Sequence, residues 1–163
     1  MLVDVELGVR LARVAIIPLE LQLQWGAETE FYISLVEQAA VILGLIEFAS
    51  WFRGRDAYWF EDNSVVLAGM VKGASSGELL DHGAASAHLL IADMRARVWW
   101  EYVQSKANWS DGASRELEHD QWVRLRGFST ERAQIPLWPW QATGADRIAA
   151  VRKVSGERAA MGD

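Results

Sequence analysis

The hydrophobic period of the chain changes near Gly26, and this change constrains the fold more than any other feature. Before it, apolar and polar residues alternate in short runs interrupted at Gly8 and Pro18, which predicts three consecutive antiparallel strands within 1–25. After it, apolar residues follow helical spacing over 35–46, around most of the helix circumference. We therefore expect a largely buried helix that packs centrally against a sheet.

Downstream of this helix, strand and helix patterns alternate. Runs rich in aromatic and β-branched residues predict strands over 57–60 and 97–103. Helical spacing predicts helices over 64–71, 78–96 and 114–125. The resulting order, β-β-β-α-β-α-α-β-α, is typical of an α/β fold with a mixed sheet.

The C-terminal part of the chain has a different pattern. Pro136 and Pro139 argue against a regular helix or a central strand over 135–140, because proline lacks a backbone donor and fixes φ. We expect this segment to lie extended on a surface with its two tryptophans as anchors, followed by a weakly ordered tail. The predicted organisation is a core domain over 1–130 and an extension over 131–163.

The charge of the 163-residue chain is concentrated in its first part. The net charge is −6, and residues 1–63 hold ten acidic and four basic residues. This sign argues against a protein that simply coats nucleic acid. The absence of cysteine excludes disulfides, thiolate metal sites and a cysteine nucleophile. A local excess of carboxylates fits either a solvated face or a metal site.

No segment has the pattern of a membrane span or a signal peptide. In the most apolar stretch, 31–52, the longest unbroken apolar run is 39–46, which is too short to cross a bilayer. Asp4 and Glu6 stand where a signal peptide needs positive charge. We expect an intracellular domain, in the cytoplasm or nucleus, without membrane contact.

Four carboxylates occupy informative places: Asp4 within the first strand, Glu37 early in the central helix, Asp62 after the next strand and Asp111 beside the last helix. Each has a plain structural explanation by itself. Asp4 would be a polar residue of an edge strand, Glu37 part of a capping box with Ser34, Asp62 a helix N-terminus and Asp111 an Asx turn. The predicted order of elements nevertheless brings all four to one end of one sheet. Carboxylates from several elements are the ligands that Mg²⁺ prefers.

Three stretches of the chain, 34–40, 59–64 and 101–115, resemble the ribonuclease H-like domain that follows the polymerase in reverse transcriptases of retroelements. The resemblance covers roughly the first 116 residues. It implies a five-stranded mixed sheet flanked by helices, and two Mg²⁺ or Mn²⁺ ions. The metal ligands and catalytic residues that it implies are Asp4, Glu37, Asp62 and Asp111.

The resemblance implies an endonuclease that cleaves the RNA strand of RNA–DNA hybrids, as one part of a longer reverse transcriptase polyprotein. Two divalent ions about 4 Å apart suit this chemistry, because they activate a water and stabilise the leaving oxygen. Recognition of the hybrid would depend on 2′-hydroxyl groups and groove shape. The candidate substrate contacts are Asn63, Lys72, Lys106, Asn108 and Arg115.

Two departures from the family pattern keep other hypotheses open. Val5 and Glu6 follow Asp4 where the family commonly has small residues, and the loop after 97–103 lacks the mobile histidine of many members. A catalytically silent connector or hybrid-binding module of a larger polymerase is therefore the main alternative. Another metal nuclease of the same fold, such as an exonuclease or a resolvase, is a third. Convergence of Asp4 with the other carboxylates distinguishes the first hypothesis from the second.

Overall fold

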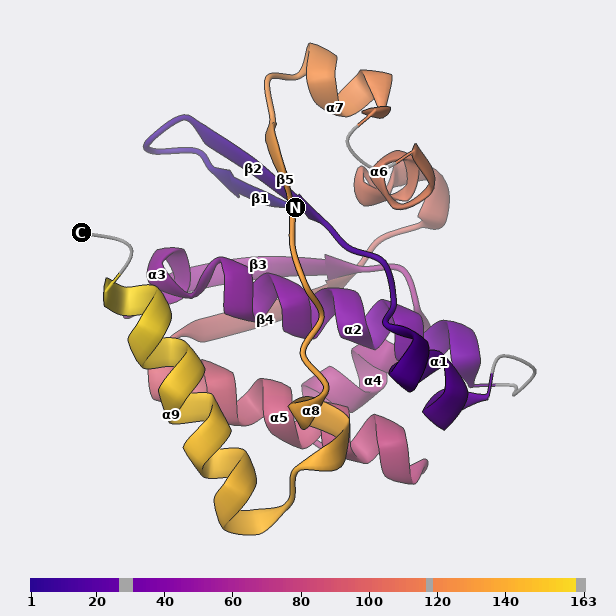
Figure 1. Cartoon of the computed structure of the whole chain (residues 1–163). Helices are drawn as coiled ribbons and strands as arrows, with labels where there is room; N and C mark the ends of the chain where they lie inside the picture. The colour runs from indigo at the N-terminus through magenta and orange to yellow at the C-terminus, as the bar shows by residue number, and fades with distance from the viewer. Residues whose placement is uncertain (27–30, 117–118, 161–163) are drawn as a thin grey trace.

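The computed structural model describes residues 1–26, 31–116 and 119–160. Strands and helices alternate along it (Figure 1). The strands are β1 (Leu2–Asp4), β2 (Val9–Val14), β3 (Asp56–Glu61), β4 (Arg97–Tyr102) and β5 (Ser129–Arg132). The helices are α1 (Leu19–Trp25), α2 (Tyr32–Glu47), α3 (Ala49–Phe52), α4 (Ser64–Lys72), α5 (Glu78–Met94), the 3₁₀ turn η1 (Ser105–Ala107), α6 (Ser110–Glu116), α7 (Gln121–Leu125), α8 (Trp138–Gln141) and α9 (Gly144–Ala160).

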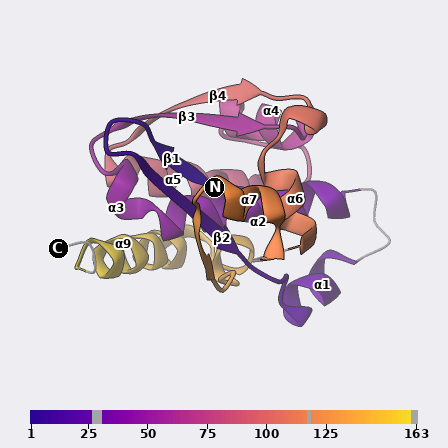
Figure 2. The ribbon, with the colours of Figure 1, turned by 90° about the horizontal axis from the view of Figure 1, so that it is seen from above.

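The strands form two sheets, and the expected α/β class with a mixed sheet is confirmed. In the first sheet, β1 is antiparallel to β2 and β2 is parallel to β5. In the second, β3 and β4 are parallel, with Asp56 beside Arg97 and Glu61 beside Tyr102. Viewed from above, the two sheets lie next to each other, in the order β4, β3, β1, β2 (Figure 2). The resemblance implies a single five-stranded sheet. In this structure the described strands form two sheets instead, with the break between β1 and β3.

The prediction of a third strand after Pro18 is wrong, because residues 19–25 form helix α1. Its alternating leucines also fit a helix, since Leu21 and Trp25 are four residues apart and both are buried on one side. Apart from Trp25, the 19–25 segment contains only leucine, glutamine and glutamate, which favour helix and include no β-branched residue. Composition thus decides the structure where the hydrophobic period is ambiguous.

Helix α2 lies at the centre of the core, as its apolar circumference predicts. It packs against α5, and a Cβ atom at Gly44 would lie only 2.6 Å from the ring of Trp59. Glycine at this position therefore allows α2 to approach β3 closely. The two elements run in opposite directions, so the N-terminal turns of α2 reach the carboxyl end of β3 (Figure 1).

The chain after residue 130 packs on the same core. The predicted boundary at 130/131 falls inside β5, and Ile135, Trp140 and Val151 belong to the main hydrophobic cluster. The 135–140 segment is not extended throughout, because Leu137 already has helical backbone angles as the N-cap of the helical turn α8. Its proline lies in the first turn, where a missing donor breaks no intrahelical bond. Trp140 is 1% exposed, so it is an anchor, as expected, but within a short helix.

The β3–β4 sheet has one covered and one open face. Helices α2, α4 and α5 lie on the covered side (Figure 1). Trp59 and Trp100 pack against the main hydrophobic cluster on this side. Side chains on the other face, including Tyr58, Phe60 and Trp99, are more than half exposed. Among the residues that the structure describes, no helix has both the length and the apolar character needed to cross a membrane.

Candidate metal centre

Three carboxylates meet at the carboxyl end of β3. Glu61 is the last residue of this strand, Asp62 follows it, and Glu37 reaches them from the second turn of α2. One carboxylate oxygen from each lies within 4.8 Å of the other two. In open sheets with parallel strands, ligands bind just outside the carboxyl ends of the strands. The cluster thus lies where the topology favours a site.

Glu61 is almost completely buried in this cluster, with 5% of its surface exposed. Its Oε1 atom accepts a hydrogen bond from the backbone N–H of Asn63 at 3.1 Å. Burial raises the pKa of Glu61 to about 8, and the like charges of Glu37 and Asp62 add to this increase. Below that pH, the Glu61 side chain is therefore mostly a neutral acid.

The plain structural explanation for Asp62 does not hold. Asn63, not Asp62, is the N-cap of α4, and its Oδ1 atom accepts hydrogen bonds from Val65 N and Val66 N at 3.0 and 3.2 Å. The Asn63 amide also donates to Ser34 Oγ on α2 at 3.3 Å. Asn63 therefore joins the two helices whose ends surround the cluster, and the Asp62 carboxylate is not used as a cap.

The capping box expected for Glu37 is also absent, because α2 begins at Tyr32 with Phe31 as its N-cap. Ser34 is consequently inside the helix rather than before it. Glu37 lies one turn further on and is half-buried at the edge of the cluster. The structure thus brings together two of the four predicted ligands, Glu37 and Asp62.

Asp4 lies elsewhere. Its carboxylate accepts a hydrogen bond from the Arg55 guanidinium at 2.6 Å and one from Leu7 N at 3.0 Å. Arg55 immediately precedes β3, so Asp4 is at the opposite end of that strand from Glu61, and the strand itself spans roughly 17 Å at about 3.3 Å per residue. The Arg55 guanidinium lowers the pKa of Asp4. The structure makes Asp4 part of a partly buried ion pair, and the convergence expected for it does not occur.

Asp111 is in helix α6, but its side chain lies outside what the structure describes. The segment that leads from β4 to α6 begins next to the cluster, because β4 ends beside Glu61 and Val103 N donates to the Glu61 carbonyl oxygen at 3.1 Å. Turn η1 and α6 then follow within a few residues. The start of α6 is therefore connected to the same end of the β3–β4 sheet.

The predicted substrate contacts are distributed around this end of the sheet, with one exception. Lys106 in η1 and Arg115 in α6 are exposed, while the Asn108 Oδ1 atom accepts from Ser110 N at 3.1 Å and holds the start of α6. Asn63 has the capping role given above. Lys72 is at the far end of α4, about 12 Å along the helix from Ser64, so the structure does not bring it to the cluster.

The donor set of the cluster fits a hard divalent cation. Mg²⁺ prefers carboxylate oxygens in small number and keeps several of its waters. The three carboxylates repel one another, as the raised pKa of Glu61 indicates, and a bound cation relieves that repulsion. Glu37, Glu61 and Asp62 are enough for one ion. A second ion of the predicted pair would need Asp111, because Asp4 is bound to Arg55.

Glu61 is the residue that sequence reasoning missed. The signal was present in the strand alternation, since Ala57, Trp59 and Glu61 must share one face of β3 and the tryptophan marks that face as the core. A glutamate at the inward end of such a strand is a buried charge. Buried charges need a partner, and here the neighbours are two more carboxylates.

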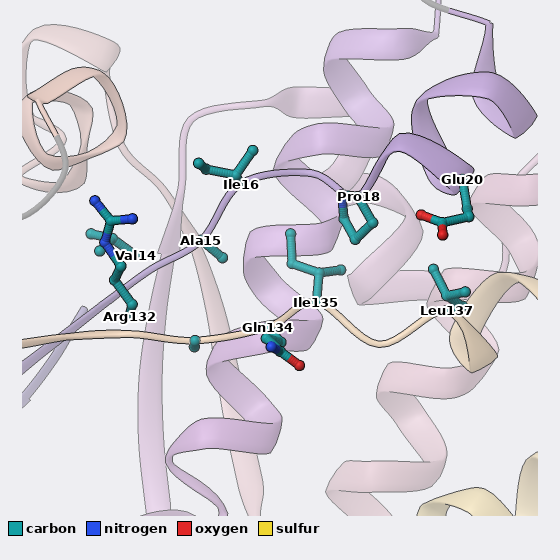
Figure 3. Close-up of a pocket in the computed structure, with 10 residues that line it drawn as sticks. Val14, Ala15, Ile16, Pro18, Glu20, Arg132, Gln134, Ile135 and Leu137 are labelled. Carbon is teal, nitrogen blue, oxygen red and sulfur yellow. The ribbon is translucent and has the colours of Figure 1, made fainter.

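A cavity of about 510 Å³ lies apart from the cluster, between the segments that follow β2 and β5 (Figure 3). Its lining is mostly apolar, with Ile135 and Leu137 on one side and Ile16 on the other. None of the three clustered carboxylates lines it. Its charged lining residues, Glu20 and Arg132, lie at opposite ends of it (Figure 3), so the acidic cluster is the better candidate site.

The chain was also compared with known proteins. No protein-family model, curated protein or solved structure matches it.

Proposed function

We propose that this chain is a divalent-metal-dependent nuclease that cleaves the RNA strand of RNA–DNA hybrids, as the ribonuclease H module of a reverse transcriptase. One observation carries the proposal. Glu37 and Asp62, which are far apart in sequence and which the sequence pattern alone singles out, lie together at the carboxyl end of a parallel strand. Neither has the capping role that would otherwise explain it.

Each residue of the cluster has a distinct task in this proposal. Glu37 and Asp62 hold Mg²⁺ or Mn²⁺, and Glu61 supplies a third oxygen once its proton is lost. When bound, such ions activate a water and stabilise the leaving oxygen of the scissile phosphate. Asn63 keeps α2 and α4 at a fixed separation through its bonds to Ser34 and to the α4 backbone. The exposed Lys106 and Arg115 are near the same end of the sheet and suit contacts with phosphate.

A specific observation favours a second candidate function, a catalytically silent hybrid-binding or connector module. Asp4, the fourth ligand in the hypothesis of an active enzyme, is bound to Arg55 at the other end of β3. If two ions are essential, a site that lacks this carboxylate binds metal and hybrid without cutting. The two candidates therefore share the metal site and differ in turnover.

The substitution Asp62→Asn tests the leading proposal. Asparagine keeps the size of the side chain and removes the charge, and the fold should persist because Asn63 caps α4. We expect Mg²⁺-dependent cleavage of a labelled RNA–DNA duplex to fall at least about a hundredfold, since even outer-shell partners of metal ligands typically contribute 10–100-fold. The assay is gel analysis of the labelled RNA strand.

The matched control is Asp56→Asn, the same substitution at the other end of the same strand, where the carboxylate forms an exposed ion pair with Arg97. Cleavage by this variant should equal that of the parent protein. Equal cleavage by the Asp62→Asn variant would remove the catalytic role of the cluster. A parent protein that binds Mg²⁺ and hybrid but does not cut would establish the silent module. Cleavage of RNA–RNA or DNA–DNA duplexes instead would indicate another nuclease of this fold.

A further inference from the structure

Strand β4 has one edge without a neighbour in the part of the chain that the structure describes. It is hydrogen-bonded to β3 alone, and it lies at the outer border of the molecule, on the far side of β3 from β1 (Figure 2). Exposed edge strands pair readily with other chains, and monomeric proteins usually protect them with proline, lysine, bulges or a covering element. The β4 segment Arg97–Tyr102 has neither proline nor lysine.

The backbone groups of this edge alternate in direction. Arg97 N donates to the Arg55 carbonyl oxygen and Val103 N to the Glu61 carbonyl oxygen, at 3.0 and 3.1 Å. Odd-numbered residues of β4 thus direct their donors and acceptors toward β3. Because the direction alternates along a strand, Val98 and Trp100 direct theirs toward the open edge. A strand that pairs with this edge can therefore form backbone hydrogen bonds with Val98 and Trp100.

The side chains on the open face of β4 are self-complementary. Arg97, Trp99 and Glu101 share this face, with the tryptophan in the middle and opposite charges two residues to either side. Trp99 is 64% exposed, and its Nε1 atom donates to Glu101 Oε2 at 3.4 Å, so the two lie side by side. Arg97 is also exposed, and it forms a bidentate pair with Asp56 of β3.

We propose that β4 pairs in antiparallel orientation with β4 of a second copy of this chain, with Trp99 opposite its own counterpart on the two-fold axis. In this register, Arg97 of one copy faces Glu101 of the other, twice. Val98 of one copy faces Trp100 of the other, and these are the residues whose backbone groups point outward. The hydrogen-bonding pattern requires even-numbered residues to face one another, and among the registers that satisfy this the charges select the one proposed.

Antiparallel geometry places the charges at favourable separations. Pairs that do not exchange backbone hydrogen bonds have their Cα atoms about 4.5 Å apart, closer than the bonded pairs, and both Arg97–Glu101 and Trp99–Trp99 are of this kind. Opposite charges and aromatic pairs directly across strands stabilise a sheet, and like charges destabilise it. The Arg97 guanidinium has enough donors to keep Asp56 and gain a second carboxylate.

Charge is the reason to choose a second copy over nucleic acid. Within the described strands β3 and β4, the open face carries Asp56, Glu101 and one cation, Arg97, which is already paired with Asp56. A phosphate backbone would meet net negative charge there. A second copy of this chain presents charges that are complementary to those of the first. The dimer then contains a four-stranded sheet whose two inner strands, both β4, are hydrogen-bonded along both edges. This inference is independent of the proposed nuclease activity.

The test uses two single charge reversals, Glu101→Lys and Arg97→Glu. Each variant alone places like charges opposite one another, because Glu101→Lys sets a lysine against Arg97 of the other copy and Arg97→Glu sets a glutamate against Glu101. When the two variants are mixed in equal amounts, every cross-strand pair in a dimer with one chain of each becomes opposite in charge. Sedimentation velocity over about 1–100 µM gives the dissociation constants, and circular dichroism confirms that each variant is folded.

We expect the parent protein to form dimers, each variant alone to dissociate about tenfold more readily, and the mixture to recover dimers that contain one chain of each. A further variant, Val98→Pro, removes an N–H that points away from β3 and should also weaken the dimer.

A parent protein that stays monomeric over this range overturns the proposal. Variants that associate as tightly as the parent, or folded variants that fail to associate on mixing, overturn it as well. Binding of single-stranded RNA that is lost in Trp99→Ala, with the protein monomeric, would assign the face to nucleic acid instead.

Discussion

Asp4 and Glu61 are two buried carboxyl groups at opposite ends of β3, and their states of ionisation differ. Their exposed fractions are similar, 7% and 5%. The pKa of Asp4 is lowered by the Arg55 guanidinium, which lies 2.6 Å away, whereas burial and two neighbouring carboxylates raise the pKa of Glu61 to about 8. Burial alone thus does not decide the charge of these groups. At Asp4 the hydrogen bond from the Arg55 guanidinium outweighs the effect of burial, whereas at Glu61 burial is the main cause of the raised pKa and the two neighbouring carboxylates add to it.

The two ends of the strand are consequently suited to different roles. The Asp4–Arg55 pair is complete within the chain and holds β1 against the start of β3. The Glu37–Glu61–Asp62 cluster contains an excess of negative charge that protonation of Glu61 only reduces. A cation from solution would replace that proton. The Asp4–Arg55 pair at one end of β3 therefore has a structural role, and the acidic cluster at the other end is suited to binding a cation.

The largest expected effect is on stability, from Glu61→Gln. The folded pKa of Glu61 is above its ordinary value of 4.5, so the folded state loses stability as the pH rises from 4.5 to 8, and the loss is complete above 8. Glutamine keeps the acceptor for Asn63 N and carries no charge. At pH 9 without metal, we expect the variant to be more stable by about 3–5 kcal/mol, measured by urea unfolding.

The pH dependence distinguishes this effect from a general benefit of removing charge. The difference between the variant and the parent should shrink as the pH falls below 8 and vanish well below the ordinary pKa of 4.5, where the parent side chain is protonated in both the folded and the unfolded state. Glu157→Gln, at an exposed position of α9, is the matched control and should change little. A difference for Glu61→Gln that stays constant from pH 4.5 to 9 contradicts the account.

A divalent cation should have the next largest effect. Metal ligands bind in their deprotonated form, so Mg²⁺ or Mn²⁺ competes with the Glu61 proton and affinity should increase as the pH rises toward 8. At a concentration a hundred times the dissociation constant, bound metal stabilises the fold by about 2.7 kcal/mol. We expect thermal unfolding of chelator-stripped protein to shift upward with Mn²⁺, more at pH 8 than at pH 6. The Asp62→Asn variant should show little of this shift.

Much of the fold follows from local patterns in the sequence. The strands at 57–60 and 97–103 and the helices at 64–71 and 78–96 are present within a few residues, and Asn63 and Gly73 bound α4. Each has a strong period and clear terminal residues. The prediction for 19–25 is wrong because an alternation of leucine and glutamine fits either period.

The candidate site is harder to predict, because it depends on where elements pack. The patterns place Glu37 and Asp62 at the ends of their elements, which is sufficient to bring them together once α2 runs against β3. Asp4 would reach the cluster only if β1 paired with β3. The sequence does not reveal that Arg55, at the other end of β3 from the cluster, binds Asp4 instead. Glu61 is easily overlooked because it stands next to a more familiar aspartate, although strand alternation places it inside.

The smallest expected effect compares Asp4→Asn with Asp56→Asn, two carboxylates that each pair with an arginine at the same end of β3. The Asp4 side chain is buried, while Asp56 and Arg97 are both largely exposed. Exposed ion pairs contribute about 0–1 kcal/mol, so Asp56→Asn should be close to neutral and Asp4→Asn clearly more destabilising at pH 7. Because the folded pKa of Asp4 is lowered, its contribution is present above about pH 4 and is lost as the pH falls further. The midpoints of urea unfolding for Asp4→Asn and the parent should therefore converge at low pH. If the two variants are equally stable at pH 7, the Asp4–Arg55 pair is not the structural contact that this comparison requires.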